Sequence, residues 1–248
     1  MIRFKNIIFL SVIIFCSCNK DSAPDCFKSN GREANEIRDI KGFNAVEVNN
    51  NVQVYIYQGN AYKIEVIGPK NLLKKVEIAL RDTVLSISNK NECAFVRGYK
   101  RKIQVFVTMP KLKYAKNNSV ANMEISPLFK QDTISVRNEN SGDIILNGSY
   151  SQIYVSSHGN GDVRLKGDCN ELLIYTNGLN YIYGQNMLVH NYAYVATLSL
   201  GDVYINGSQL KQLDYHIHNA GNIYCTGTPI TFNNTFENFG KGKLIKLN

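Results

Sequence analysis

The chain has 248 residues, of which 44% are hydrophobic and 19% are charged, a composition that allows it to bury a core without being embedded in a membrane. Its 15 tyrosines and 11 phenylalanines, together with abundant Val, Ile and Thr, favour β-strands over helices. The net charge of +8 is a modest excess. Together with the export signal described next, it argues against nucleic acid as a partner.

The first 17 residues have the features of a lipoprotein signal peptide. Arg3 and Lys5 precede an apolar run that is about half as long as the ~20 residues of a membrane-spanning helix. The run closes on Ser17 directly before Cys18, which resembles a lipobox. We therefore expect cleavage before Cys18 and acylation of Cys18. Acylation of Cys16 and a plain signal peptide are the alternatives.

Acyl chains on Cys18 would make the membrane a partner through a lipid anchor. We expect a location in the cell envelope, at the outer membrane, facing either the periplasm or the cell surface. The polar residues 18–36 are predicted to form a flexible tether, and residues 37–248 a single domain.

A seven-residue phrase recurs through the second half of the sequence. Its clearest copies are GDIILNG, GDVRLKG, GDVYING and GNIYCTG, and weaker copies fill the gaps. Copies begin at residues 121, 142, 161, 178, 201, 221 and 242, a spacing near 20 residues. A repeat of this length indicates stacked structural units.

The apolar residues of each repeat alternate with polar ones. The third and fifth positions of the phrase are apolar, as in Ile144 and Leu146, and a second alternating run precedes each phrase, as in Ile134 and Val136. Each repeat therefore supplies two short strands whose apolar side chains point inward. The glycines that bracket the phrase mark the corners.

A parallel β-helix fits this pattern best. One coil of about 20 residues would stack on the next at ~4.8 Å and bury a continuous apolar column. Propeller blades need about 40 residues, and leucine-rich repeats need a motif that is absent here. A string of antiparallel hairpins is the remaining alternative.

Residues 37–110 are rich in strand patterns but less regular than residues 111–248, which carry the repeats. We expect the first segment to form irregular coils that cap one end of the stack. One short helix is expected at residues 71–76, after Pro69.

The order of these features resembles a known family. The segment IRDIKGFNAVEVNNNVQVYIYQGN is followed by NLLKKVEIALRDTVLSIS, by IQVFVTMPKLKYAKNNSVANMEI and then by the GD phrases. From about Ile37 to the C-terminus this order resembles the putative autotransporter adhesin head GIN domain family of Bacteroidetes-type lipoproteins. The resemblance implies a right-handed, single-stranded β-helix in the cell envelope and supplies no catalytic residues. The phrase loses its Asp or Asn at Leu179 and Lys243, where we expect distorted rungs.

The fourth position of the phrase points outward and holds Tyr181, Tyr204 and Tyr224 in three successive coils. Rings repeated every ~4.8 Å would offer sugars a flat apolar strip with hydroxyl groups at its margin. Tyr183 and Arg164 would extend the strip, and these five residues are the candidate ligand-binding set. A ladder that only stabilises the sheet is the simpler explanation of the same pattern.

The second position of the clear copies holds a carboxylate or an amide, in Asp143, Asp162, Asp202 and Asn222. Such a column could bind calcium, but calcium needs six or more oxygen ligands. We instead expect these side chains to cap the corners by accepting hydrogen bonds from nearby backbone N–H groups. His216 and His218 share a strand face and are expected to form a solvent-facing pair, so we predict no metal and no cofactor.

Four cysteines follow the signal segment: Cys26, Cys93, Cys169 and Cys225. Cys169 and Cys225 lie three predicted coils apart, or ~14 Å, which is too far for a disulfide. Cys225 is expected to be a buried thiol, and Cys26 with Cys93 is the one possible disulfide.

The sequence thus predicts a non-enzymatic envelope lipoprotein, an adhesin or a module that binds a glycan or a protein. A structural component of a larger envelope assembly is one alternative. A polysaccharide-active β-helix enzyme is another, but it needs convergent carboxylates on one outer face. Only Arg164 and Lys166 beside Asp143 and Asp162 approach that arrangement, so we predict no catalytic residues.

Overall fold

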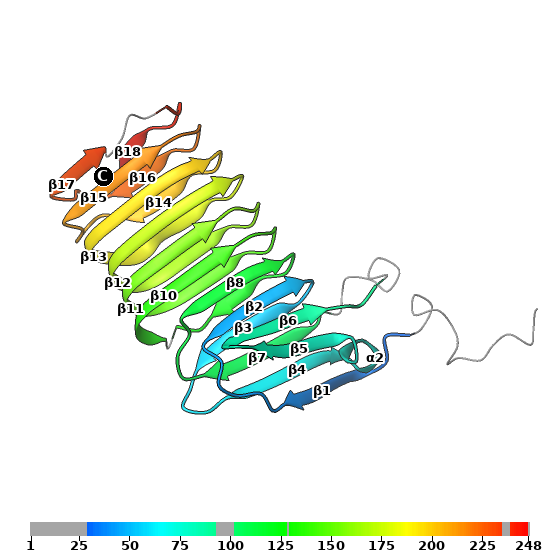
Figure 1. Cartoon of the computed structure of the whole chain (residues 1–248). Helices are drawn as coiled ribbons and strands as arrows, with labels where there is room; N and C mark the ends of the chain where they lie inside the picture. Colours follow the sequence, from blue (N-terminus) through cyan, green and yellow to red (C-terminus); the bar gives the residue numbers. More distant parts are fainter. Residues whose placement is uncertain (1–28, 93–101, 128, 235–238, 248) are drawn as a thin grey trace, which may run out of the picture.

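The structure, a computed structural model, describes residues 29–92, 102–127, 129–234 and 239–247. Within these residues 18 strands join into one continuous hydrogen-bonded sheet. Figure 1 shows this sheet wound into an elongated stack of coils, with the N-terminal strands at one end and the C-terminal strands at the other. The predicted β-solenoid, with about 20 residues per coil, is confirmed.

Each coil contributes one strand segment to each of two faces. The repeat phrases and the strands aligned with them form face A, which contains β7 (Gln104–Met109), β3 (Gln53–Gln58), β9 (Met123–Ile125), the first halves of β11 (Ile144–Ser157), β12 (Val163–Gly178) and β13 (Ile182–Ser199), β14 (Val203–Asn206), β16 (Ile223–Thr226) and β18 (Leu244–Leu247). The second strand segments of the coils form face B, which contains β6 (Val84–Asn89), β2 (Ala45–Asn50), β8 (Tyr114–Ser119), β10 (Lys130–Asn138), the second halves of β11 to β13, β15 (Gln212–Ile217) and β17 (Thr231–Asn234).

Neighbouring coils of the repeat region pair in parallel and in register. Equivalent residues on face A lie 19 to 21 positions apart in the sequence and follow one another as Met123, Ile144, Val163, Ile182, Val203, Ile223 and Leu244. Because every pair in this series is parallel, the alternative of antiparallel hairpins is wrong for the repeats.

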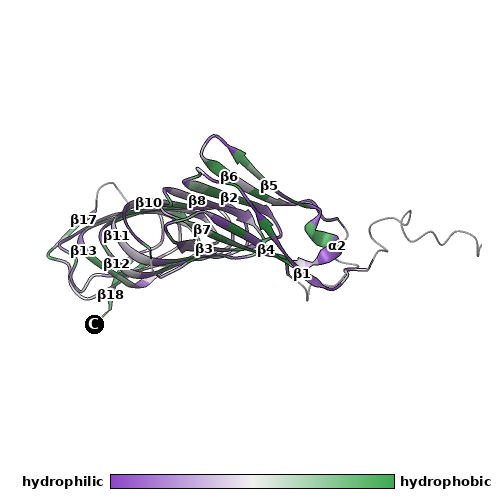
Figure 2. Ribbon diagram, turned by 90° about the horizontal axis from the view of Figure 1, so that it is seen from below, coloured by the Kyte–Doolittle hydropathy of each residue, from purple (hydrophilic) through white to green (hydrophobic). Residues whose placement is uncertain are grey.

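The core lies between the two faces and is continuous along the stack. Ile144 and Leu146 on face A and Ile134 and Val136 on face B are fully buried, as predicted. One cluster of buried side chains extends from Phe43 to Cys225. Figure 2 shows hydrophobic and hydrophilic residues alternating along the strands, which is the pattern that lets one side of a strand face the core.

The corners between the faces are smoother than the sequence predicts. In β11, β12 and β13 the two predicted short strands join into single strands of 14, 16 and 18 residues that continue around the corner. The register of β12 with β13 shifts there, between Arg164 and Lys166 and between Cys169 and Glu171. Gly148 (φ 150°) and Gly167 (φ 124°) provide the turn, and a Cβ on Gly167 would lie 1.9 Å from the Gly148 carbonyl oxygen. Glycine is therefore required there for both its backbone conformation and its small size.

The N-terminal end differs from the repeats in strand direction. β4 (Lys63–Pro69) is antiparallel to both β7 and β1 (Glu33–Arg38), and β5 (Val76–Arg81) is antiparallel to β6, with which it forms a hairpin. The expected irregular coils at this end are thus partly replaced by antiparallel strands. β1 also begins four residues inside the predicted tether, whose residues 18–28 lie outside the described residues.

The N-terminal end also differs in chain order. β6 and β7 pair with one side of the coil formed by β2 and β3, and β8 and β9 pair with its other side. The chain must therefore pass over one complete coil between β7 and β8. Residues 110–113 make this crossing.

A one-turn helix, α2 (Lys70–Leu73), follows Pro69 as the sequence predicts, one residue earlier than expected. The extended conformation of Pro69 precedes the turn, and the buried side chains of Leu72 and Leu73 hold it against the core. The helix ends before residue 76 because Val76 begins β5.

The glycines at the first position of the phrase allow the coils to approach closely, and this can be tested by adding one methyl group. A Cβ on Gly161 would lie 2.2 Å from the Gly142 carbonyl oxygen. We expect Gly161→Ala to lower the free energy of unfolding by about 1–3 kcal/mol, measured by urea denaturation, because the coil must shift to relieve the clash. The control is Ala121→Gly, at the equivalent corner where a Cβ is already accommodated, which should cost less than about 1 kcal/mol. Equal effects of the two variants would contradict the close-approach explanation.

Candidate functional site

One row of outward residues on face A runs along the stack. The strand pairing joins them in the order Phe106, Tyr55, Glu124, Ile145, Arg164, Tyr183, Tyr204, Tyr224 and Ile245. We call these residues the face A row. Its position is fixed by the parallel register, because equivalent positions in successive coils lie directly beside one another.

Three consecutive members of the row, Tyr183, Tyr204 and Tyr224, form what we call the tyrosine ladder. The ring centroids of Tyr183 and Tyr204 are 5.5 Å apart and those of Tyr204 and Tyr224 are 4.9 Å apart. The planes of both pairs differ by 10°. The ladder is therefore a stack of nearly parallel rings.

Tyr181 lies beside the ladder and not in it. The register pairs Tyr183, not Tyr181, with Tyr204, so the prediction that Tyr181 occupies the fourth position is wrong. In this coil the phrase begins two residues later than the sequence suggests. Asn180, and not Gly178, stacks on Gly201 at the corner. The Tyr181 ring nevertheless stacks on Tyr183 at 6.0 Å, so the structure brings all five predicted binding residues together.

Arg164 lies at the lower end of the ladder. Its Cζ atom is 4.4 Å from the centroid of the Tyr183 ring, a cation–π contact. Nη2 of Arg164 lies 3.1 Å from the Asp162 carboxylate, and Nε lies 3.6 Å from that of Asp143. The two carboxylates orient the guanidinium and balance its charge. A shallow pocket of about 170 Å³ adjoins it, lined by Ile145, Asn147, Arg164, Leu165, Lys166, Tyr183, Gln185 and Asn186.

The stacking decides which part of each ring is available to a ligand. Because the ring faces of the ladder pack against one another, the ring edges and hydroxyl groups point outward. A ligand would therefore contact the edges of the rings and not the flat ring faces that the sequence led us to expect. Partial burial raises the pKa of Tyr204, with nearby Asp202 adding to the effect, so this phenol is neutral and can both donate and accept a hydrogen bond. The ladder thus offers an apolar edge with a row of hydroxyl groups.

The column of Asp and Asn residues at the second position caps backbone groups, as expected. Oδ1 of Asp143 accepts a hydrogen bond from the Asp162 N–H (2.9 Å), and Oδ1 of Asp162 accepts one from the Tyr181 N–H (3.0 Å). Asp202 and Asn222 repeat the arrangement with the next coil. Because the Lys243 N–H donates a hydrogen bond to Oδ1 of Asn222 and β18 keeps its register, the distortion expected at this rung is absent.

Asp202 provides the cleanest test of this capping ladder. Its Oδ1 accepts a hydrogen bond from the Asn222 N–H at 2.8 Å. We expect Asp202→Ala to lower the free energy of unfolding by about 1 kcal/mol in urea denaturation, because the N–H loses its acceptor. Asp202→Asn keeps an oxygen at this place and should have a smaller effect. A loss of similar size in both variants would show that the negative charge, and not the hydrogen bond, stabilises the corner.

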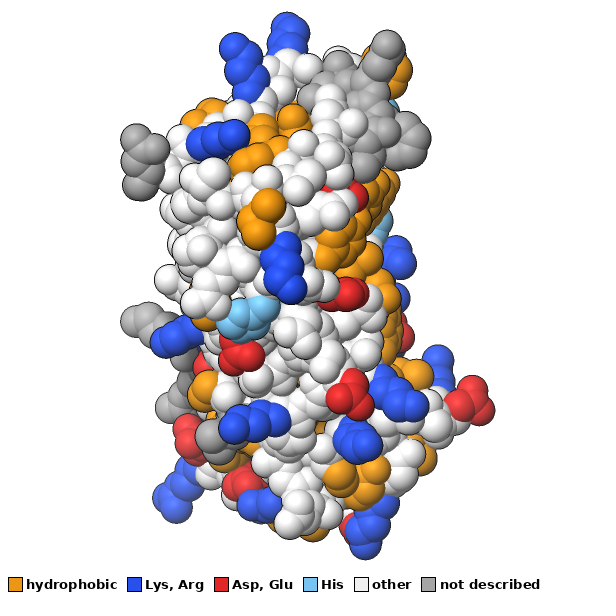
Figure 3. Space-filling model, turned by 90° about the vertical axis from the view of Figure 1, so that its left-hand side faces the viewer, with side chains coloured by type: hydrophobic (Ala, Val, Ile, Leu, Met, Phe, Trp, Pro, Cys, Tyr) orange, Lys and Arg blue, Asp and Glu red, His pale blue; other side chains and the backbone are white. Residues whose placement is uncertain are grey.

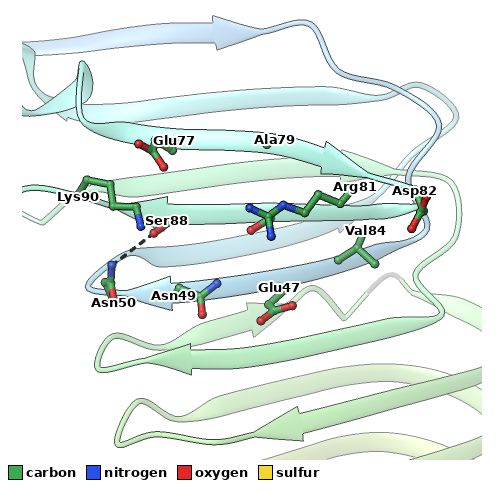
Figure 4. Close-up of a pocket in the computed structure, with 11 residues that line it drawn as sticks. Glu47, Asn49, Asn50, Glu77, Ala79, Arg81, Asp82, Val84, Ser88 and Lys90 are labelled. Carbon is green, nitrogen blue, oxygen red and sulfur yellow. Dashed lines mark hydrogen bonds between the residues drawn. The ribbon is translucent and has the colours of Figure 1, made fainter.

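A groove lies at the N-terminal end of the stack, outside the repeats. It has a volume of about 570 Å³ and is lined by Glu47, Asn49, Asn50, Glu77, Ala79, Arg81, Asp82, Val84, Ser86, Ser88 and Lys90. Figure 4 shows side chains from β5 on one side of β6 and from β2 on the other. The sequence pattern does not predict this groove, because the antiparallel placement of β5 that forms it has no counterpart in the repeats.

The predicted histidine pair is close, with ring centroids of His216 and His218 separated by 3.9 Å. Among the described residues, no group of three or more His, Cys, Asp or Glu side chains is placed to hold a metal ion. Likewise, in the part of the chain that the structure covers, no helix is long and apolar enough to cross a membrane.

Two of the cysteines can be placed. Cys169 and Cys225 are both buried and free, so the prediction that they do not pair is confirmed. Burial raises the pKa of Cys169 to about 12 and that of Cys225 to about 11, so both are neutral thiols at physiological pH. Cys18, Cys26 and Cys93 lie outside the described residues, and their predicted roles stay predictions.

Face B carries an aromatic patch that is not among the predicted sites. Tyr154, Leu173 and Tyr194 are successive partners in one outward row, and Tyr175 lies in the adjacent row. Tyr154 and Tyr175 are 39% and 40% exposed. Figure 3 shows hydrophobic side chains gathered along one margin of the repeats, while the middle of that side is mostly polar. The alternation that places Ile153 and Val155 inward could have identified this patch.

Comparison with known proteins agrees with this geometry. Residues 42–229 match the family described as putative auto-transporter adhesin, head GIN domain. Among curated proteins none matches the chain.

Several crystal structures share the fold. A putative adhesin from Bacteroides fragilis has 19% sequence identity and a TM-score of 0.78, over 87% of this chain and 97% of that one. A putative adhesin from Parabacteroides merdae has 17% identity and a TM-score of 0.66, over 89% and 98%. A putative lipid binding protein from Parabacteroides distasonis has 14% identity and a TM-score of 0.59, over 89% and 98%.

Proposed function

The chain belongs to the putative auto-transporter adhesin, head GIN domain family, and from this premise we propose that it is a non-enzymatic binding protein of the cell envelope. Its ligand is an elongated glycan that lies along the tyrosine ladder. The names of the similar adhesins favour a binding role over catalysis.

The observation that carries this proposal is the ladder itself. Tyr183, Tyr204 and Tyr224 present ring edges and hydroxyl groups at a spacing of 4.9 to 5.5 Å on a rigid sheet. A saccharide chain has apolar C–H surfaces and closely spaced hydroxyl groups, so it complements an edge that alternates the same two kinds of group. Because the side chains are held by their neighbours, little conformational entropy is lost on binding.

The pocket at the Arg164 end of the ladder could hold one end of the glycan. Arg164, held by Asp143 and Asp162, lies with amide side chains around this hollow. Paired charges and amides provide many hydrogen bonds with little net charge, which suits a neutral sugar. This end is also where the ladder stops, since Ile145 follows Arg164 in the row.

The position of the ladder fits an anchored protein. We propose that acylated Cys18 anchors the protein to the outer membrane. Cys18 precedes the first described residue in the sequence, and the described chain begins at the N-terminal end of the stack (Figure 1). The ladder belongs to coils near the other end, so it would project away from the membrane. The similarity to a putative lipid binding protein does not favour a lipid inside this fold, because the interior positions are filled by packed side chains.

Replacing the ladder tests the proposal directly. The test variant carries Tyr183→Ser, Tyr204→Ser and Tyr224→Ser, and its retention on a glycan array is compared with that of the unchanged protein. We expect retention to fall at least about tenfold on the glycans that the unchanged protein binds, equivalent to ~1.4 kcal/mol, because the apolar edge and three phenols are lost. Circular dichroism checks that the variant is folded.

The matched control removes three tyrosines from face B of neighbouring coils: Tyr154→Ser, Tyr175→Ser and Tyr194→Ser. It should retain glycans as the unchanged protein does. If the ladder variant is less stable yet binds glycans fully, or if the unchanged protein binds none, then the ladder only stabilises the sheet and the proposal is wrong.

A further inference from the structure

A second concave surface lies where the chain crosses over one coil. Residues 110–113 connect β7 to β8 and pass outside the coil of β2 and β3. The next corner along the stack begins β10. Between these segments is a hollow of about 450 Å³, lined by Lys111, Lys113, Lys130, Gln131, Asp132 and Thr133.

Two glutamine side chains fix the backbones that carry the lysines. The Gln131 amide pairs with Leu112, accepting its N–H at 3.1 Å and donating to its carbonyl at 2.5 Å. The Gln58 amide accepts the Lys130 N–H at 2.9 Å and donates to the carbonyl oxygens of Lys130 and Pro110 at 3.2 and 3.1 Å. The side-chain amides of Gln131 and Gln58 therefore join the crossing segment to the start of β10. They bind backbone N–H and C=O groups as the backbone of a neighbouring strand would.

The charge of this hollow is unbalanced. Three lysines and one aspartate line it, so it carries an excess of two positive charges. Elsewhere on the described chain, lysines such as Lys63 and Lys116 pair with glutamates. No carboxylate among the described residues lies within ion-pair distance of Lys111, Lys113 or Lys130. The hollow thus gathers three lysines that form no ion pair with the described carboxylates.

We propose that this hollow is a binding site for a phosphate group. Each ammonium group is a compact point charge with three donors, and three of them around one concavity suit a small anion with several acceptor oxygens. The hydroxyl group of Thr133, which also lines the hollow, adds a further donor. The site differs in charge from the ladder and lies in other coils, so it stands whether or not the ladder binds glycans.

The phosphate group could belong to a soluble molecule or to a membrane lipid, and the experiment separates these sources. Every protein is the full chain with Cys16→Ser and Cys18→Ser, so that no acyl chain contributes. One arm measures line broadening of inorganic phosphate in ³¹P NMR at low ionic strength. The other measures co-sedimentation with phosphatidylcholine vesicles, with and without phosphatidylglycerol.

The test variant carries Lys111→Gln, Lys113→Gln and Lys130→Gln. The control carries Lys211→Gln, Lys241→Gln and Lys243→Gln, which removes the same charge from exposed lysines near the C-terminal end. We expect the test variant to bind phosphate at least about tenfold more weakly, from the loss of three charges, and the control to bind it normally. Circular dichroism and thermal unfolding verify that both are folded.

The vesicle arm then identifies the source. If the unchanged protein and the control variant sediment with phosphatidylglycerol vesicles and the test variant does not, the result supports the site and assigns it to a lipid head group. Phosphate binding without vesicle binding supports the site and assigns it to a soluble phosphate or a phosphorylated saccharide. Equal losses in the test and control variants would overturn the proposal, because the effect would then follow net charge. Failure of the unchanged protein to bind phosphate or these vesicles would overturn it as well.

Discussion

The structure depends on one constraint, which is that successive coils pair in parallel and in register through backbone hydrogen bonds. Each residue of a coil therefore has an equivalent directly above it and another below it. Ile144 lies between Met123 and Val163 in this way, and all three are buried. Glycines such as Gly161 permit this close approach at the corners, and Asp or Asn side chains bind the N–H groups that the corners expose. The same register that builds the core also aligns the outward side chains into rows.

Rows of this kind give the surface its chemistry. On face A the row changes from an aromatic pair, Tyr55 and Phe106, through Glu124 to the ladder that begins at Tyr183. One substitution in one repeat changes one place in a row, so a solenoid can vary its surface without altering its core. The two proposed sites use different features of this design. The ladder arises from regular stacking, whereas the phosphate site arises where the stacking is interrupted by the crossing at residues 110–113.

Much of the repeat region could be predicted from the sequence, because alternation and glycine spacing report directly on burial. The inward places of Ile134, Ile144 and Cys225 and the capping role of Asp162 follow from that pattern. The register near Tyr181 could not be predicted, because Gly178 and Asn180 are both plausible corner residues and only the pairing decides between them. The strand order at the N-terminal end could not be predicted either. The placement of β2 between β6 and β8, which creates the hollow around Lys130, depends on long-range pairing that no local pattern reveals.

The register can be measured directly with pairs of introduced cysteines in a chain whose own cysteines have been replaced. A disulfide requires Cα atoms within about 7 Å, which adjacent in-register positions satisfy and positions two residues out of register do not. The account predicts that Tyr183→Cys with Tyr204→Cys forms a disulfide readily under mild oxidation, whereas Tyr181→Cys with Tyr204→Cys does not. Preferential linkage of the second pair would contradict it, because the coils would then be displaced and the tyrosine ladder would not exist as described.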